Sequence, residues 1–418
     1  MSTFERHVLD NGLRILTANL PYAQSVTCMI MIAAGSRYET PDTNGIAHFS
    51  EHMFFKGTER RPDARAIAGE IDSIGGEFNA FTSKESTAYF VRCAADHRDV
   101  ALDVLVDMLR NSRFDSGEID REKGVIVEEM NMYFDTPRDY IGGVYDELLY
   151  GDQPLGWDII GKKETVRAAT RETFMGYLDR WYHPERMVVG IAGRIGDDAV
   201  ERVSALLGDL PAAQTGAPSP VQGYMNGRVK VFTKASDQAH VVVGVPSYPL
   251  EHPDRYALQM LATVLGGGMS SRLFTEVRER RGLAYYVYGV NHSYTDAGSL
   301  YSQAGVDITR IDEALTTIAT ELKGMTTAVP TDELEKARSF SKGRFVLQLE
   351  NPQGLISFGL RKEVLEGRAP DPEEVLAGIS AVTAEDVQRV AQDLLADDKL
   401  RLAVIGPFDD AERFEKLL

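Results

Sequence analysis

The chain repeats one pattern of elements on either side of a segment at its midpoint. Residues 210–227 hold three prolines among small and polar residues, which is typical of an extended linker. A Pro-Asp pair opens a helical run at Pro41, and another opens a comparable run at Pro253. The sequence therefore predicts two diverged copies of one unit, residues 1–209 and 228–418, joined by that linker.

A second pair of helices supports the repeat. Comparable helices begin near Glu118 in the first copy and near Glu333 in the second, and each runs into a proline, Pro137 or Pro352. Because proline cannot continue a helix, both helices are expected to end there. The two copies thus share the order of their elements, although few residues are identical.

Each copy mixes strand and helix patterns. Residues 8–16 read as a hairpin that turns at Asn11-Gly12, and residues 26–33 form a β-rich run. Long helices are expected over 99–111 and 115–134. This pattern predicts an α+β fold of two homologous units, each a largely antiparallel sheet with helices stacked on one face.

Composition excludes several classes of protein. A chain of 418 residues is too long for one ordinary core, and its net charge is −18 from 45 Lys and Arg against 63 Asp and Glu. Nucleic acid is therefore an unfavourable partner, because phosphate binding needs clustered cations. The longest apolar stretch, Val26–Ala34, is far shorter than the roughly 18 residues that suggest a membrane span.

The cysteines and the N-terminal residues bear on location. Cys28 and Cys93 stand in apolar, strand-like surroundings and are interpreted as small buried side chains rather than a disulfide framework. The first residues show neither an apolar signal core nor an Arg- and Ser-rich transit pattern. We expect a bacterial cytoplasmic protein or a processed form in an organellar matrix.

A short motif carries the chemistry. His48 and His52 lie four residues apart on an expected helix that Asn44 caps, so both imidazoles project from one face and can reach one Zn²⁺. Glu51 reaches the same face, where it can take a proton from water. The pattern H-x-x-E-H arises by chance in roughly one such chain per hundred and is a known peptidase signature.

The third metal ligand stays open on the residues alone. The remaining histidines are scattered, so carboxylates are the candidates. Glu122 and Glu129 lie two turns apart on the helix 115–134 and share a face, whereas Glu128 is rotated about 100° away. One face with two carboxylates suits a metal ligand and a supporting group, and it equally suits a solvated acidic surface.

The motif, together with the position of Glu129 relative to it, resembles the pitrilysin/insulinase family of zinc peptidases, the inverzincins. The length and the residues around His48 are closest to the mitochondrial-processing-peptidase-like branch. The resemblance implies one Zn²⁺ per chain held by His48, His52 and Glu129. It implies that Glu51 is the general base and that Glu122 is an additional catalytic acidic residue.

Residues 75–83 read by themselves as an exposed edge strand with paired glycines. They also resemble the family's strand that pairs with the substrate backbone. This resemblance implies substrate binding by Gly76, Phe78, Asn79 and Ala80, with Asn79 a candidate for holding the oxyanion. Main-chain pairing would let a peptidase accept many sequences.

The second copy lacks the metal motif. When Pro253 is aligned with Pro41, the residues Met260, Thr263 and Val264 stand where the first copy has the two histidines and Glu51. When the later helices are aligned at their first glutamates, Arg344 stands opposite Glu129. The second copy is therefore predicted not to bind the metal.

The second copy does hold Arg278 and Tyr285, seven residues apart, beside a glycine that closes a basic helix end. In the family, an Arg and a Tyr at this spacing bind substrate and stabilise the tetrahedral intermediate. Family members with four such units form a clamshell in one chain, so this chain would be half of a clamshell. The resemblance thus implies a homodimer in which Arg278 and Tyr285 reach the zinc site of the other subunit.

The sequence predicts a zinc-dependent endopeptidase that cleaves short or unfolded peptides in a dimeric chamber. Basic, presequence-like peptides are one candidate substrate, because an acidic chamber would attract them. Two alternatives stay open: a non-catalytic scaffold subunit of the same family, and a catalytic subunit that needs a different partner chain.

Overall fold

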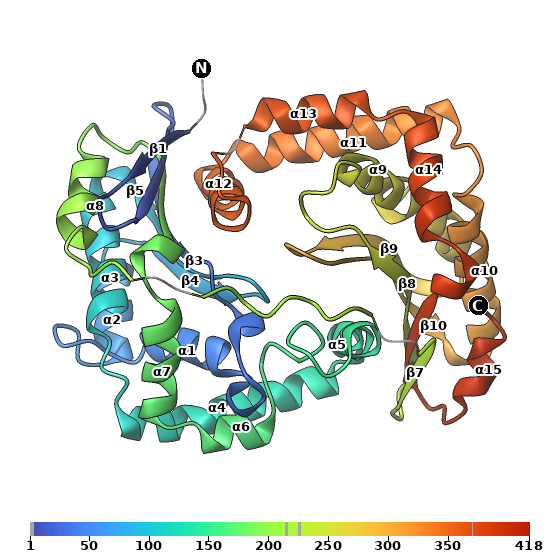
Figure 1. The fold of residues 1–418 in the computed structure, drawn as a ribbon, viewed down its shortest axis with the longest axis horizontal. Helices are drawn as coiled ribbons and strands as arrows, with labels where there is room; N and C mark the ends of the chain where they lie inside the picture. The colour runs from blue at the N-terminus through green and yellow to red at the C-terminus, as the bar shows by residue number, and fades with distance from the viewer. Residues whose placement is uncertain (1–3, 214–215, 225–226, 370) are drawn as a thin grey trace. The chain divides into compact units, whose positions relative to one another are not determined.

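The computed structural model describes residues 4–213, 216–224, 227–369 and 371–418 (Figure 1). The chain forms two compact units. Unit 1 consists of Met1–Asn131, Asp158–Ser219 and Val346–Pro372. Unit 2 consists of Met132–Trp157, Pro220–Phe345 and Glu373–Leu418.

Unit 1 contains a six-stranded sheet in the order β1-β2-β6-β3-β5-β4. Its strands are β1 (Glu5–Val8), β2 (Arg14–Asn19), β3 (Ser25–Ile32), β4 (Glu77–Thr82), β5 (Thr87–Ala94) and β6 (Met187–Gly193). All neighbours are antiparallel except β2 and β6. The predicted hairpin is confirmed as β1 and β2, and Gly12 in its turn adopts a φ of +87° that suits glycine.

Unit 2 contains a five-stranded sheet in the order β7-β11-β8-β10-β9. Its strands are β7 (Val229–Thr233), β8 (Gln238–Ser247), β9 (Ala284–Ser293), β10 (Gly298–Asp307) and β11 (Arg401–Gly406). Only β7 and β11 run parallel. This order reproduces β2-β6-β3-β5-β4 strand for strand, including the one parallel pair, so the predicted pair of homologous α+β units is confirmed.

The helices also correspond between the two units. In chain order the α-helices are α1 (Ile46–Phe54), α2 (Ala64–Asp72), α3 (Arg98–Asn111), α4 (Ser116–Asp135), α5 (Pro137–Tyr150), α6 (Lys163–Ala168), α7 (Arg171–Trp181), α8 (Ala199–Leu207), α9 (Arg255–Gly266), α10 (Ile311–Gly324), α11 (Thr331–Leu349), α12 (Pro352–Glu366), α13 (Pro372–Ala381), α14 (Ala384–Leu394) and α15 (Ala411–Glu415). A π-helix, η5 (Phe274–Arg280), takes the place that α2 has in the first copy. As the sequence predicts, α4 and α11 end just before the prolines that begin α5 and α12.

Each sheet has helices of its own copy on one face and a single exchanged helix on the other. In unit 1, α12 packs on β2, β3 and β6, where Ile356 and Leu360 contact the sheet core. In unit 2, α5 packs on β7, β8 and β11 through Ile141 and Val144. The second faces are thus buried as well, and this arrangement was not foreseen from the sequence.

Because α5 and α12 are exchanged, the limits of the two repeats differ from those of the two compact units. The predicted limits 1–209 and 228–418 follow the repeats, whereas α5 and α12 each belong to the compact unit of the other copy. Whether each repeat is an independent domain stays a prediction. The described part of the predicted linker 210–227 forms no helix or strand, and residues 214, 215, 225 and 226 lie outside the described residues.

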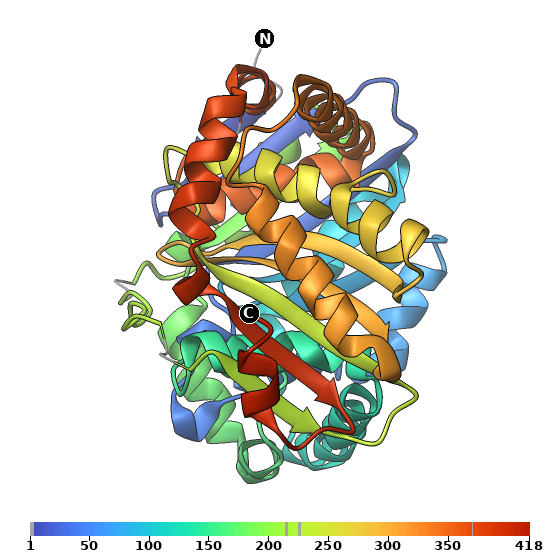
Figure 2. The ribbon, with the colours of Figure 1, turned by 90° about the vertical axis from the view of Figure 1, so that its right-hand side faces the viewer.

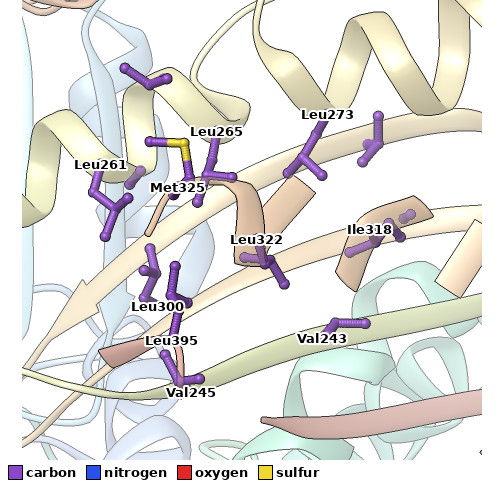
Figure 3. Packing of buried hydrophobic residues seen from close by; sticks show 14 of the residues in the cluster. Val243, Val245, Leu261, Leu265, Leu273, Leu300, Ile318, Leu322, Met325 and Leu395 are labelled. Atoms are coloured by element: carbon purple, nitrogen blue, oxygen red, sulfur yellow. The ribbon is translucent and has the colours of Figure 1, made fainter. Parts of the chain in front are cut away.

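The larger core of unit 2 lies between its sheet and helices of the same copy. Figure 3 shows Val245 of β8 below Leu261 and Leu265 of α9. Val243 of the same strand lies below Leu322 and Ile318 of α10. Figure 2 looks onto this unit, with α10 in orange lying over the strands. Within the described ranges, no helix is long and apolar enough to cross a membrane.

Candidate metal centre

Helix α1 carries the H-x-x-E-H motif, and a buried carboxylate holds its first turn. Glu39 accepts hydrogen bonds from the backbone N–H groups of Gly45 and Ala47 at 2.9 and 2.8 Å. Asn44 does not cap the helix, contrary to the sequence prediction; its amide instead donates to Glu39 at 2.9 Å. Gly45 has a φ of +97°, and a Cβ there would lie 2.7 Å from the Ile160 carbonyl oxygen.

The two histidines of α1 meet one carboxylate of α4. The ring centroids of His48 and His52 lie 4.7 Å apart. Oε1 of Glu129 lies 3.7 Å from His48 Nε2, and its Oε2 lies 3.5 Å from His52 Nε2. One ligand atom from each of the three residues lies within 4.8 Å of the other two, and no other such group of three occurs among the described residues.

This donor set fits a zinc ion. Two ligands about 2.05 Å from zinc at the tetrahedral angle would be about 3.3 Å apart, close to the 3.7 and 3.5 Å between Glu129 and the two histidines. Burial lowers the pKa of His48 to about 3, and His52 adds to this effect, so the imidazole is neutral as a metal ligand must be. Two histidines and one carboxylate also leave a fourth position for water or substrate.

Glu122 orients the second histidine. Its Oε1 lies 3.0 Å from Nδ1 of His52, and its Oε2 lies 2.6 Å from the Lys56 ammonium. Burial alone would raise the pKa of Glu122, but the hydrogen bonds from His52 and Lys56 outweigh it and lower the pKa. An ionised Glu122 holds the proton of His52 on Nδ1, which leaves Nε2 with its lone pair toward Glu129.

Glu51 lies beside the ligand set and has its own support. Its Oε2 accepts a hydrogen bond of 2.5 Å from the hydroxyl of Thr82, at the end of β4. Burial raises the pKa of Glu51 above its ordinary value, against the opposing effects of Thr82 and His52. A carboxylate whose proton affinity is raised in this way suits a general base.

The predicted substrate strand is an edge strand. Among the described strands β4 pairs with β5 alone, so its other edge could accept an added strand. Phe78, Asn79 and Ala80 lie within β4, and Gly76 directly precedes it. The side chain of exposed Asn79 accepts a hydrogen bond from the backbone N–H of Ala80 at 2.9 Å. Substrate binding by these four residues stays a prediction.

The predicted Arg and Tyr pair lies in unit 2. Arg278 belongs to the π-helix η5, and its guanidinium lies 5.7 Å from the ring centroid of Tyr285 and 4.7 Å from that of Phe274. Tyr285 is 72% exposed at the start of β9, so its hydroxyl is available to a ligand. The structure therefore brings Arg278 and Tyr285 together in unit 2, whereas the metal ligands belong to unit 1.

Three residues of the centre were missed in the sequence. Lys56 follows His52 by four residues, just beyond the end of α1, and this spacing could have indicated a partner for the carboxylate of α4. Thr82 lies within the strand that was singled out, but its contact with Glu51 depends on how β4 packs beside α1. Glu39 gave no signal, because it lies outside the helix that it caps.

Comparisons with known proteins identify the family of the chain. Residues 14–162 match the family described as insulinase, peptidase family M16, and residues 168–340 match the peptidase M16 inactive domain. A Bacillus subtilis protein named as an uncharacterized zinc protease is 37% identical over 96% of this chain and 98% of its own. A Streptomyces coelicolor protein of the same description is 37% identical over 99% of this chain and 91% of its own.

Solved structures show the same fold. A protease from Helicobacter pylori superposes with a TM-score of 0.87 at 22% identity, covering 97% of this chain and 100% of its own. A peptidase M16 inactive domain from Pseudomonas fluorescens gives the same TM-score at 20% identity, covering 97% and 98%. With its motif, its repeat and these matches, the chain belongs to the insulinase family of peptidases, family M16.

Proposed function

We propose that the protein is a zinc-dependent endopeptidase with one catalytic centre per chain, in unit 1. The observation that carries this proposal is the convergence of His48, His52 and Glu129 within 4.8 Å, with Glu51 beside them. The names of the related zinc proteases support it. The second copy has no such group among the described residues, which supports one metal per chain.

Different residues of the chain would carry out the proton transfers and hold the metal ligand in place. Glu51 takes a proton from the attacking water and later gives it to the leaving amine. Glu122 and Lys56 keep His52 oriented throughout. When bound, zinc supplies a Lewis acid that polarises the peptide carbonyl and the water.

The substrate would bind as an added strand on β4. An extended peptide can pair its backbone with the open edge at Phe78–Ala80 without any required side chain. This mode favours short or unfolded peptides, since a folded chain rarely offers a free strand. The net charge of −18 further favours basic, presequence-like peptides by long-range attraction.

Arg278 and Tyr285 would complete the site from a second subunit. The exposed ring of Tyr285 and the half-buried guanidinium of Arg278 beside it support binding of a developing oxyanion or of the substrate backbone. A homodimer in which each subunit lends this pair to its partner would form a closed chamber, as the family resemblance implies. The chain would then need no other partner.

Replacement of the general base tests the proposal. Glu51→Gln should lower kcat by about 10²–10⁴-fold, because the amide cannot accept the proton, while zinc content stays at one per chain. Glu128→Gln, on the exposed side of α4, is the matched control and should keep full activity. Metal content by elemental analysis and cleavage of a quenched peptide measure the two effects. Full activity of Glu51→Gln would overturn the assignment.

A further inference from the structure

A cavity of about 360 Å³ lies within unit 2, between α9, η5, α10 and α11. Its size is within the range of sites that bind small molecules. None of its lining residues belongs to the metal centre, and all of them lie in unit 2. The role proposed for the metal centre therefore does not account for this cavity.

The cavity is lined by residues that correspond to a histidine of the metal centre and to the carboxylate that orients it. Val264 and Ala337 line it, and by the repeat they correspond to His52 and Glu122. In unit 1 those two long side chains touch at 3.0 Å. Replacing both with short apolar side chains leaves space between the helices, so the second copy keeps a hollow where the first has contacts.

Several of the residues that line the cavity are charged. Arg272 pairs with Glu333 at 2.7 Å, and Arg280 pairs with Glu276. Glu321 also lines the cavity but has no ion pair or hydrogen bond among the described residues. Burial raises the pKa of Glu321, and the nearby carboxylates of Glu276 and Glu333 add to this effect, while Arg272 and Arg281 oppose it. A cationic group in the cavity could pair with this carboxylate.

A buried hydroxyl points to the same conclusion. Ser271 is 6% exposed and lines the cavity, and its Oγ has no hydrogen-bond partner among the described residues. A buried hydroxyl without a partner is costly, and most such groups in proteins bind water or a ligand. Ser271 thus offers an acceptor and a donor on the wall of the cavity.

The rim and one wall supply the remaining chemistry. The Lys336 ammonium donates to the carbonyl oxygen of Ser270 at 2.7 Å and has two further hydrogens for an anionic group. Phe340 joins Val264 and Ala337 as apolar surface. The cavity therefore combines an unpaired carboxylate, a cationic rim and an apolar wall in one small volume.

We propose that this cavity binds a free amino acid or dipeptide with an apolar side chain. The ligand's ammonium group would meet Glu321 and the Ser271 hydroxyl, its carboxylate would meet Lys336, and its side chain would lie against Phe340. Such zwitterions are also what peptide hydrolysis releases. The binding proposal, however, does not depend on the proposed function, because no residue of the metal centre takes part.

Calorimetric titration of the full-length protein with L-leucine and L-leucyl-leucine tests the proposal. Saturable binding of at least one of them is expected, together with loss of binding for its N-acetyl derivative, which lacks the ammonium, and weaker binding for its amide, which lacks the carboxylate. Glu321→Gln should weaken binding about tenfold, as loss of a charged hydrogen bond does. Glu313→Gln, on the same helix and paired with Arg310 at the surface, is the control and should bind as the unaltered protein does.

Two further variants separate this site from structural effects and from the metal centre. Ser271→Ala removes an unpartnered hydroxyl, so it should keep or raise Tm while weakening binding about threefold to tenfold. His48→Ala should bind the zwitterion unchanged even if hydrolysis is lost. The proposal is overturned if neither ligand binds saturably, if Glu321→Gln binds normally, or if His48→Ala abolishes binding.

Discussion

Helices α1 and α4 of unit 1 correspond to α9 and α11 of unit 2. The two pairs hold the same places in the repeat but carry different side chains where their helices face each other. In unit 1 the facing positions hold two partly exposed histidines and two glutamates. In unit 2 the positions of His48 and His52 hold Met260 and Val264, which are 0% and 5% exposed. The same backbone arrangement therefore supports a polar centre in one copy and an apolar core in the other.

This difference shows what a metal centre needs beyond ligand spacing. His48 and His52 lie on a helix face that is partly exposed, with 14% and 23% of their side-chain surfaces open. Met260 is instead part of the central core of unit 2. The second copy has kept the helix and used that face for packing, with the small cavity as the remainder.

The largest expected effects come from substitutions at one pair of corresponding positions, His48 in the first copy and Met260 in the second. His48→Ala should lower zinc affinity by more than about 100-fold and abolish hydrolysis, with little loss of stability. Met260→Ala should keep its zinc and destabilise the protein by about 2–5 kcal/mol, because it opens a void in the core. Zinc content and denaturant unfolding measure both.

The comparison would be contradicted if either substitution had the effect on zinc that is expected of the other. Zinc loss on Met260→Ala would mean that the second copy takes part in metal binding. Stoichiometric zinc in His48→Ala would remove His48 from the ligand set and leave the geometry of α1 and α4 without its proposed purpose.

The two units can also be tested as complementary halves of one site. Neither Glu51→Gln nor Arg278→Ala should hydrolyse peptide alone. When equal amounts are dissociated and mixed, half of the dimers should pair one of each, and each such dimer has one complete site. Activity should recover to about a quarter of that of the unaltered protein. No recovery, with mixed dimers verified by tagging, would count against sharing Arg278 across the dimer.

Much of the fold was predictable because its signals are local or periodic. The prolines at 137 and 352, the hairpin turn and the spacing of His48 and His52 each depend on neighbouring residues, and the structure confirms the elements that they predict. The exchange of α5 and α12 could not be read in this way. It depends on which sheet each helix packs against, and the periodicity within a helix does not specify that sheet.

The same contrast between local signals and contacts between elements applies to the candidate site. Glu122 and Glu129 could be placed on one face by helical periodicity, but that periodicity did not say which of them meets both histidines. Glu39 and Thr82 act through contacts between different elements, and the chain gives no spacing rule for such contacts. The resemblance to a known family supplied the ligand assignment that the residues alone had left open.

A smaller effect should follow from Glu122→Gln. The amide keeps the shape but loses the charge that holds the Nδ1 proton of His52 and pairs with Lys56. Zinc affinity should fall by about 10–100-fold, as is usual for loss of such a supporting group. Competition with a fluorescent chelator measures this, and Glu128→Gln again serves as the control. In unit 2 the corresponding Ala337 has no such role, so Ala337→Ser should leave zinc affinity unchanged.

The smallest expected effect concerns how each copy starts its helix. Glu39 accepts three hydrogen bonds at the start of α1, whereas Asp254, the residue before α9, makes no side-chain cap and pairs with Arg389 at the surface. Glu39→Gln turns one acceptor into a donor that faces N–H groups, which should cost about 1–3 kcal/mol of unfolding free energy.

The matched change Asp254→Asn should cost at most about 1 kcal/mol, because an exposed ion pair contributes little. Urea unfolding of both variants, with zinc removed, measures the two values without a contribution from the metal. Equal losses would mean that the buried carboxylate does no more for α1 than a surface residue does for α9. A larger loss for Glu39→Gln would show that the metal-bearing helix is held in place by a contact that its counterpart lacks.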